Sequence, residues 1–134
     1  MNLLRSFASV LVSYIVVFLI VFLSDPVLAH LFPGQYVRGQ VPPATLLWID
    51  TAIFAAASIV GGWLCALMAP SRPGMHLFLL FLIGEMLGVA TTIASWNKWP
   101  HWHSLVWLLL WPVCLWLGAL GRRGSRRTSG AAIT

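Results

Sequence analysis

Four long apolar runs cover most of the 134-residue chain and leave little sequence outside them. They are approximately residues 3–23, 44–69, 75–96 and 104–120. A helix rises about 1.5 Å per residue, so about 20 apolar residues cross the roughly 30 Å hydrocarbon layer of a bilayer. Backbone groups in lipid must be paired within the protein, and the runs lack the alternating pattern of barrel strands. We therefore predict an all-α fold, an integral membrane four-helix bundle formed by residues 1–121.

The composition agrees with this class and excludes a soluble globular domain, because 60% of the residues are hydrophobic and only 8% are charged. The formal net charge is +5. The basic residues lie at the ends of the apolar runs rather than on one folded surface, so we predict no nucleic-acid partner.

The positions of Lys and Arg predict the orientation in the membrane. The positive-inside rule expects more Lys and Arg residues on the cytoplasmic side of a membrane than on the outer side. An orientation with both termini in the cytoplasm satisfies this rule. The cytoplasmic side then holds Arg5, Arg72, Arg122, Arg123, Arg126 and Arg127, and the outer side holds Arg38 and Lys98.

The first apolar run has an alternative interpretation as a cleaved signal peptide, with Arg5 as its basic region and residues 27–29 as a cleavage site. Its apolar stretch reaches or exceeds the usual length of roughly 7 to 15 residues. We expect an uncleaved transmembrane helix.

Two segments outside the runs carry structural signals. Ser24, Asp25 and Pro26 predict the start of a short external helix over about 26–32. Residues 122–134 combine four arginines with Gly, Ser and Thr, which predicts a disordered cytoplasmic tail. We expect Arg122, Arg123, Arg126 and Arg127 to contact anionic lipid headgroups, at ~1 kcal/mol each.

Small residues at helical spacing predict close helix packing. The second run carries Ala55, Ser58 and Gly62 on one side, and the third carries Gly84 and Gly88. Helices in lipid associate through such surfaces, because small side chains let two backbones approach. We expect the two small-residue stripes to face each other.

Glu85 lies about halfway along the third run, where an ionised carboxylate is costly and rarely faces lipid. We expect it to point into the bundle as the neutral acid and to donate to the carbonyl of Leu108, which Pro112 leaves free. A packing role and a proton or ion site both remain open. Asp50 lies nearer the outer end of its helix, within reach of Lys98 or Arg38, and an outer vestibule from Asp50 to Glu85 is a further possibility.

Aromatic residues gather at the predicted outer surface, where indole rings settle at headgroup depth. This aromatic belt contains Trp48, Trp96, Trp99, Trp102 and Trp107. A stripe from His103 through Trp111 to Gly118 favours packing over a quinone, haem or pigment contact, and no cofactor is predicted.

Motifs for catalysis and metal binding are sparse. His101 and His103 flank a tryptophan and are candidates for a zinc or copper site, with His30 or Asp25 as a possible further ligand, a pattern that does not by itself predict a metal. Cys65 and Cys114 are predicted to be small core residues rather than a disulfide. No catalytic residue is predicted, and an enzyme ranks third among the functional classes.

The chain resembles small four-helix inner-membrane proteins of bacteria in the order of Asp50, Gly61 and Gly62, His76, then Pro100 and Trp102. The resemblance covers residues 50–123 and implies a location in the bacterial inner membrane. The chain also resembles small multidrug transporters in length, helix count and one deep glutamate. It departs from them because their glutamate lies on the first helix.

Two functions are consistent with these features. The favoured one is an accessory or scaffold subunit that packs against other membrane-protein subunits. The alternative is a homo-oligomeric proton- or ion-coupled transporter or channel that uses Glu85. The surroundings of Glu85 discriminate between them, because a dry, filled bundle favours the subunit and a water-reachable cavity favours the carrier.

Overall fold

The computed structural model describes residues 2–37 and 39–131, with side chains for residues 3–37, 39–124 and 130. The described chain contains four helices and no strand. They are α1 (Asn2–Leu31), α2 (Ala44–Met68), α3 (Pro73–Ala94) and α4 (His101–Ala131). All four are long and apolar enough to cross a membrane, which confirms the all-α four-helix prediction and suggests a multi-pass membrane protein.

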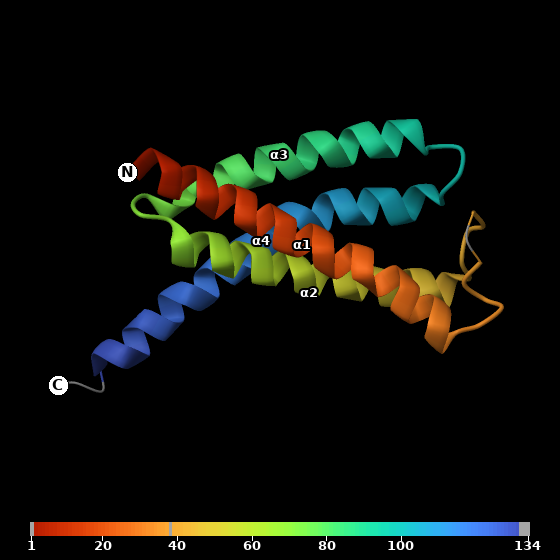
Figure 1. The fold of residues 1–134 in the computed structure, drawn as a ribbon, viewed down its shortest axis with the longest axis horizontal. Coiled ribbons are helices and arrows are strands. Elements are labelled where there is room, and N and C mark those ends of the chain that lie inside the picture. Colours follow the sequence, from red (N-terminus) through yellow and green to blue (C-terminus); the bar gives the residue numbers. More distant parts are fainter. Residues whose placement is uncertain (1, 38, 132–134) are drawn as a thin grey trace.

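The helices run back and forth, so each end of the bundle collects particular connections (Figure 1). One end holds both chain termini and the turn at residues 69–72, and we call it the terminal end. The other holds residues 32–43 and 95–100, and we call it the loop end.

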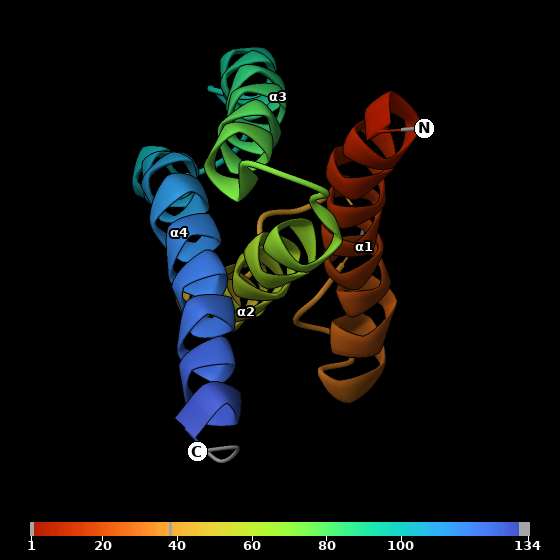
Figure 2. The ribbon, with the colours of Figure 1, turned by 90° about the vertical axis from the view of Figure 1, so that its left-hand side faces the viewer.

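α2 occupies the centre of the bundle (Figure 2). α1 and α4 pack on opposite sides of it, and they meet through the edge-to-face rings of Tyr14 and Trp111, whose centroids are 6.5 Å apart. α3 lies across the space between α1 and α4 and contacts all three other helices. Only His76 and Leu80 are buried on α3, so this helix is the least covered of the four.

The closest helix contact joins α2 and α4 through glycines on both sides. A Cβ atom at Gly62 would overlap the carbonyl oxygen of Leu115, and one at Gly118 would overlap the carbonyl oxygen of Ile59. Two backbones therefore touch directly, the close approach that small residues permit in membrane helices. Leu115 is 1% exposed and fills the centre of this contact.

The expectation that the stripes of α2 and α3 face each other is wrong. Gly62 is turned to the backbone of α4, and Gly84 lies against the ring of Trp111, also on α4. Gly88 lies against Leu108 on the same helix. Both glycine faces are therefore directed at α4: Gly84 leaves space for the Trp111 ring, and Gly62 lets the backbone at Leu115 approach. Ser58 is fully buried and Ala55 is half-buried.

α1 packs on α2 along its serines. Ser9 and Ser13 are fully buried, and each hydroxyl donates to a carbonyl of α1 itself, at 2.8 Å to Ser6 and 2.6 Å to Ser9. Gly61 of α2 faces Val17 and the carbonyl of Ser13. The hydroxyls are thus satisfied locally, and the seam is a packing surface.

Two helix boundaries differ from the sequence predictions. α1 runs through Pro26 to Leu31, so the short external helix expected at 26–32 is the end of α1. A proline removes a single backbone donor. Beyond it Leu28 is 3% exposed, and its carbonyl accepts from the Phe32 amide at 2.9 Å, which holds the last turn.

α4 extends to Ala131, so residues 122–131 are helical rather than part of a disordered tail. Arg122 donates from Nη1 to the carbonyl of Ala66 at 3.0 Å, which fixes the first residue of this extension on α2. Arginine is also a good helix former. The side chains of Arg126 and Arg127 and residues 132–134 lie outside the described part.

Candidate functional site

A groove of about 1000 Å³ lies in the loop-end half of the bundle, between α1, α3 and α4. Its lining comes from the second half of α1, the second half of α3 and the first half of α4, with α2 and residues 36–42 completing it. The volume is at the upper end of the roughly 300–1,000 Å³ typical of small-molecule pockets. The bundle is therefore not filled at this end.

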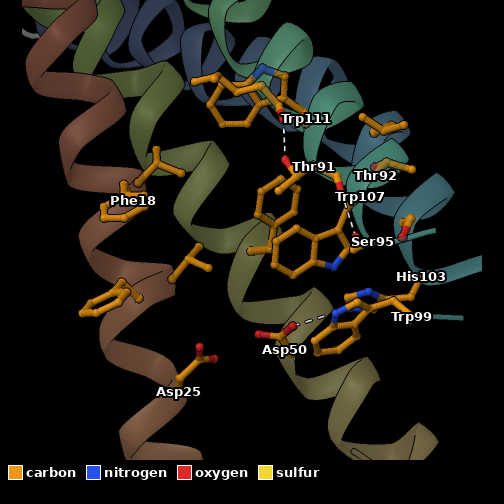
Figure 3. A pocket seen from close by; sticks show the side chains of 18 of the residues that line it. Phe18, Asp25, Asp50, Thr91, Thr92, Ser95, Trp99, His103, Trp107 and Trp111 are labelled. Atoms are coloured by element: carbon orange, nitrogen blue, oxygen red, sulfur yellow. Dashed lines mark hydrogen bonds and ion pairs between the residues drawn. The ribbon is translucent and has the colours of Figure 1, made fainter. Parts of the chain in front are cut away.

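The groove contains every acidic side chain in the sequence, which has three. Asp25 comes from α1, Asp50 from α2 and Glu85 from α3. Figure 3 shows Asp25 and Asp50 on neighbouring walls of the space. No lysine or arginine is among the described residues that line it. Apart from His103, the ionisable groups of the described lining are therefore acids and tyrosines, in a chain whose net charge is positive.

Glu85 lies near the middle of α3, at the deep end of the groove, where Tyr14 and Trp111 also line it. The residue is partly exposed, yet its Oε2 atom is shielded and has no hydrogen-bond partner. This atom therefore does not make the expected bond to the Leu108 carbonyl. Buried polar atoms without partners are uncommon in proteins, and each calls for an explanation.

Asp50 is paired with His103, a partner that the sequence did not suggest. The distance from His103 Nε2 to Asp50 Oδ2 is 3.5 Å, with the two side chains 9% and 13% exposed (Figure 3). His103 Nε2 makes no hydrogen bond, so the contact is an ion pair when the imidazole is protonated. Rings surround the imidazole at 5.1–5.7 Å, from Trp99, Trp102 and Trp107.

Asp25 accepts a hydrogen bond of 2.7 Å from the Tyr36 hydroxyl. This bond ties the loop after α1 back onto α1 at the mouth of the groove. Burial is the main reason that the pKa of Tyr36 is raised above its ordinary value of 10.0, and the bond to Asp25 and the charges of Asp25 and Asp50 raise it further. The phenol is therefore a stable donor at neutral pH.

Stacked rings fix the walls of the deeper groove. Phe54 and Trp107 stack with centroids 4.1 Å apart and planes 9° apart. Trp107 donates from Nε1 to Thr51 Oγ1 at 3.3 Å, and Trp111 donates from Nε1 to the carbonyl of Phe81 at 3.1 Å. With their N–H groups engaged by the protein, both indoles present fixed ring surfaces.

The five predicted belt tryptophans have different surroundings. Trp48 stacks on Trp102 at 4.9 Å, and Trp96 stacks on His101 at 3.8 Å. Trp99 and Trp107 line the groove. The structure thus brings two of them to the carboxyl groups.

His101 and His103 have separate partners, Trp96 for one and Asp50 for the other. Among the described residues, no three His, Cys, Asp or Glu side chains are grouped so that they could hold a metal ion. Cys65 and Cys114 are free thiols that are 0% and 4% exposed.

Sequence reasoning did not predict that Phe18, Phe22 and Asp25 of α1 line the same space as Glu85. Tyr14, Phe18, Phe22 and Asp25 all line the groove. They recur at steps of three and four residues, the spacing of one helix face. That periodicity was the available signal, but Asp25 next to Pro26 was explained as a helix cap instead.

Comparisons of the chain with protein-family models, curated proteins and solved structures find no match. The chemistry of the groove therefore carries the functional argument.

Proposed function

We propose that the protein is a small membrane carrier that couples the movement of a solute to that of a proton, with Glu85 as the titrating group. The observation that carries this proposal is the groove of about 1000 Å³ that reaches Glu85. A dry, filled bundle favours an accessory subunit, whereas a cavity around a deep carboxyl favours a carrier.

The unpartnered oxygen of Glu85 supports the same function. A carboxyl group kept for packing gains from hydrogen bonds that satisfy both oxygens, and Oε2 has none. A carboxyl group that exchanges a proton for a solute needs an unoccupied face toward the solute. Intramembrane acids commonly mark such ion and proton pathways.

A carrier of this size acts as a homo-oligomer, because four helices are too few to enclose a complete pathway. The weakly covered α3 offers a surface for a second copy, since His76 and Leu80 are its only buried residues. The outward side of this helix includes Met86, which is 71% exposed, and Ile93, which is 72% exposed.

The proposal places the terminal end in the cytoplasm of a bacterium and the groove mouth on the outer side of the inner membrane. Arg5, Arg72, Arg122 and Arg123 lie toward the terminal end, near the ends of the apolar runs, which supports this orientation under the positive-inside rule. Arg122 and Arg123 then lie at the depth of anionic headgroups.

The test is solute-driven proton flux into liposomes that contain the purified protein and an internal pH dye. Outward gradients of cationic, neutral and anionic organic solutes are imposed one class at a time. We expect one class to drive proton movement in the wild type and not in Glu85→Gln. Trp116→Leu, which changes an exposed α4 side chain away from the groove, is the control expected to retain flux.

The second candidate is the accessory subunit, which the exposed surface of α3 favours. Native mass spectrometry of gently extracted membranes distinguishes the two. Absence of flux with every solute class, together with a stoichiometric complex with other membrane proteins, contradicts the carrier and supports the subunit. A homo-oligomer without partners supports the carrier.

A further inference from the structure

We infer that a second, smaller cleft at the terminal end binds one anionic phospholipid, whose phosphate group lies between Arg122 and Arg123 and whose acyl chains follow α4 into the bilayer. This inference goes beyond a general attraction of arginines to an anionic surface, because it assigns one lipid molecule to one place. It is independent of the carrier function and requires only that the helices cross a membrane.

The cleft lies where α4 leaves the rest of the bundle, and its volume is about 350 Å³ (Figures 1 and 2). Its walls are the last turn of α2, the turn at residues 69–72, the first turns of α3 and residues 116–123 of α4. This volume is near the lower end of the roughly 300–1,000 Å³ typical of small-molecule pockets. The cleft can therefore take a compact headgroup, and the chains of a lipid must lie outside it.

Two adjacent arginines line the α4 side of the cleft, and one of them is held in place. Arg122 is half-buried and donates from Nη1 to the carbonyl of Ala66 at 3.0 Å. A guanidinium group carries five N–H donors, so further donors remain for a ligand. Arg123 is exposed and also lines the cleft. Guanidinium groups match the oxygens of a phosphate through paired, charge-assisted hydrogen bonds.

No acidic side chain neutralises these arginines. The sequence has three acidic residues, and all of them line the groove in the loop-end half. Among the described residues, the one ion pair is that of Asp50 and His103. Arg72 lies in the turn beside the lining residue Ser71 and adds a third positive charge at this end. The cleft therefore selects an anion.

The wall that the turn forms is fixed before a ligand binds. The carbonyl of Arg72 accepts from the Met75 amide at 3.0 Å and from His76 Nδ1 at 3.1 Å. His76 is 6% exposed, so this contact anchors the turn on the buried side of α3. Ser71 lines the cleft, and its hydroxyl can donate to a phosphate oxygen. Such preorganisation lowers the cost of binding.

The apolar part of the lining favours a lipid over a soluble phosphate ester. Leu77 of α3 and Leu120 of α4 line the cleft, and both are half-buried. Leu120 precedes Arg123 by three residues, so about 4.5 Å of helix separates the apolar from the charged lining. Leu117, three residues before Leu120, is 48% exposed. A lipid with its phosphate at the arginines thus has an apolar surface along which its chains can lie.

The experiment is native mass spectrometry of the full chain in mixed micelles with three probes. Dioleoylphosphatidylglycerol is the anionic lipid. Dioleoylphosphatidylcholine has the same chains and a zwitterionic headgroup, and glycerol 3-phosphate has the phosphate ester without chains. We expect one phosphatidylglycerol retained per chain, with at least about tenfold preference over phosphatidylcholine, since each arginine near an anionic headgroup contributes about fivefold. Glycerol 3-phosphate at the same concentration should not displace it.

Three variants locate the site. Arg122→Gln and Arg123→Gln should each lower the retained phosphatidylglycerol by at least about fivefold. Gly74→Leu leaves every charge in place and should weaken retention to a similar extent by filling the cleft, because Gly74 lines it and a Cβ there has nothing within 4 Å. The matched control is Arg5→Gln, which removes an exposed arginine at the same end outside the cleft and should change retention by less than about twofold.

Equal retention of the two lipids would overturn the inference, and so would displacement of phosphatidylglycerol by an equal concentration of glycerol 3-phosphate. Equal losses in Arg5→Gln and Arg123→Gln would mean diffuse attraction to the membrane surface instead of a site. If Arg122→Gln does not fold because it loses the bond to Ala66, then Arg123→Gln and Gly74→Leu decide. A loss confined to the cleft variants supports the site.

Discussion

The two halves of α4 face different neighbours across the same side of the helix. Toward the loop end, His103, Trp107 and Trp111 face the groove and its carboxyl groups. Toward the terminal end, Cys114 and Leu115 are buried, and Gly118 meets the α2 backbone directly. Large rings hold α4 apart from its neighbours in the loop-end half. In the terminal-end half, a glycine lets α4 and α2 touch.

The difference separates the part of the bundle that gives stability from the part that can bind a ligand. Direct backbone contact gives dense van der Waals packing, which is the main force between helices in lipid. The groove lacks this dense packing, and at its deep end one oxygen of Glu85 has no hydrogen-bond partner. Substitutions in the tight half should therefore mainly change stability, and substitutions in the groove half should mainly change ligand binding or proton coupling.

The largest expected effect on stability is Gly118→Ala in the tight half of α4. The added methyl overlaps backbone atoms of Ile59 and Trp63, which cannot turn away as a flexible side chain can. We expect the free energy of unfolding to fall by about 1–3 kcal/mol, measured by denaturant unfolding in detergent. Gly121→Ala, three residues along α4 with nothing within 4 Å of its Cβ, is the matched control. Equal stability of the two variants would contradict the direct backbone contact.

A smaller loss of stability is expected for Thr51→Val. This substitution tests the contact between α2 and Trp107, which lies in the groove half of α4. Thr51 is 5% exposed and accepts the 3.3 Å bond from Trp107 Nε1, so the variant leaves this indole N–H unpaired. We expect a loss of about 1 kcal/mol and a changed tryptophan emission spectrum. Ser58→Ala serves as the control, because the Ser58 hydroxyl bonds only to a carbonyl of its own helix in the structure, that of Phe54 at 2.7 Å. A loss in the control as large as in Thr51→Val would count against a role for the indole bond.

Tyr36→Phe should change stability less, by about 0.5 kcal/mol, because its bond to Asp25 is exposed to solvent. Its pH dependence has a definite sign. The folded pKa is raised above that of an unfolded tyrosine, about 10, so the unfolded state loses its proton first. The contribution of Tyr36 is therefore complete below about pH 10 and is lost as pH rises through the folded pKa.

The measurement for Tyr36 is an alkaline titration of tyrosinate absorbance in the wild type and in Tyr36→Phe, together with unfolding at neutral and alkaline pH. The difference spectrum reports Tyr36 and should show ionisation well above pH 10. Ionisation near pH 10 would mean that the loop is not held against α1.

The smallest effect on stability is expected for Glu85→Gln, although its effect on proton coupling should be complete. Oε2 has no hydrogen-bond partner to lose, so the free energy of unfolding should change by less than about 0.5 kcal/mol. Thermal unfolding beside the flux assay checks both properties. A loss larger than that of Gly118→Ala would identify Glu85 as a structural residue.

Most of the fold was predictable because the bilayer limits the choices. The apolar runs give the number of helices, and the lengths needed to cross lipid give their approximate bounds. The errors in the helix bounds fell at the ends, where a proline or a few arginines are weaker signals than tertiary contacts. Pro26 stays inside α1 while Leu28 beyond it is buried, and Arg122 is held by Ala66.

The site was less predictable. Glu85 stood out because an acid at mid-membrane depth is costly. Its surroundings did not follow from the sequence, because glycine pairs indicate close approach without naming the helix that approaches. Gly62 and Gly84 both face α4, and the groove opens where α1 and α3 diverge toward the loop end. Asp25 and the Asp50–His103 pair depend on that arrangement of helices.

The most direct test of the central claim asks whether water reaches the groove at mid-membrane depth while the rest of α3 faces lipid. Leu87 lines the groove and its neighbour Met86 does not, although both are exposed in the bundle. Single cysteines at these two positions are treated with a charged methanethiosulfonate in nanodiscs, with buried Cys65 and Cys114 as internal controls. The account predicts that Leu87→Cys is labelled while Met86→Cys and the native thiols are not. Equal labelling of the two variants, or none of either, would contradict it.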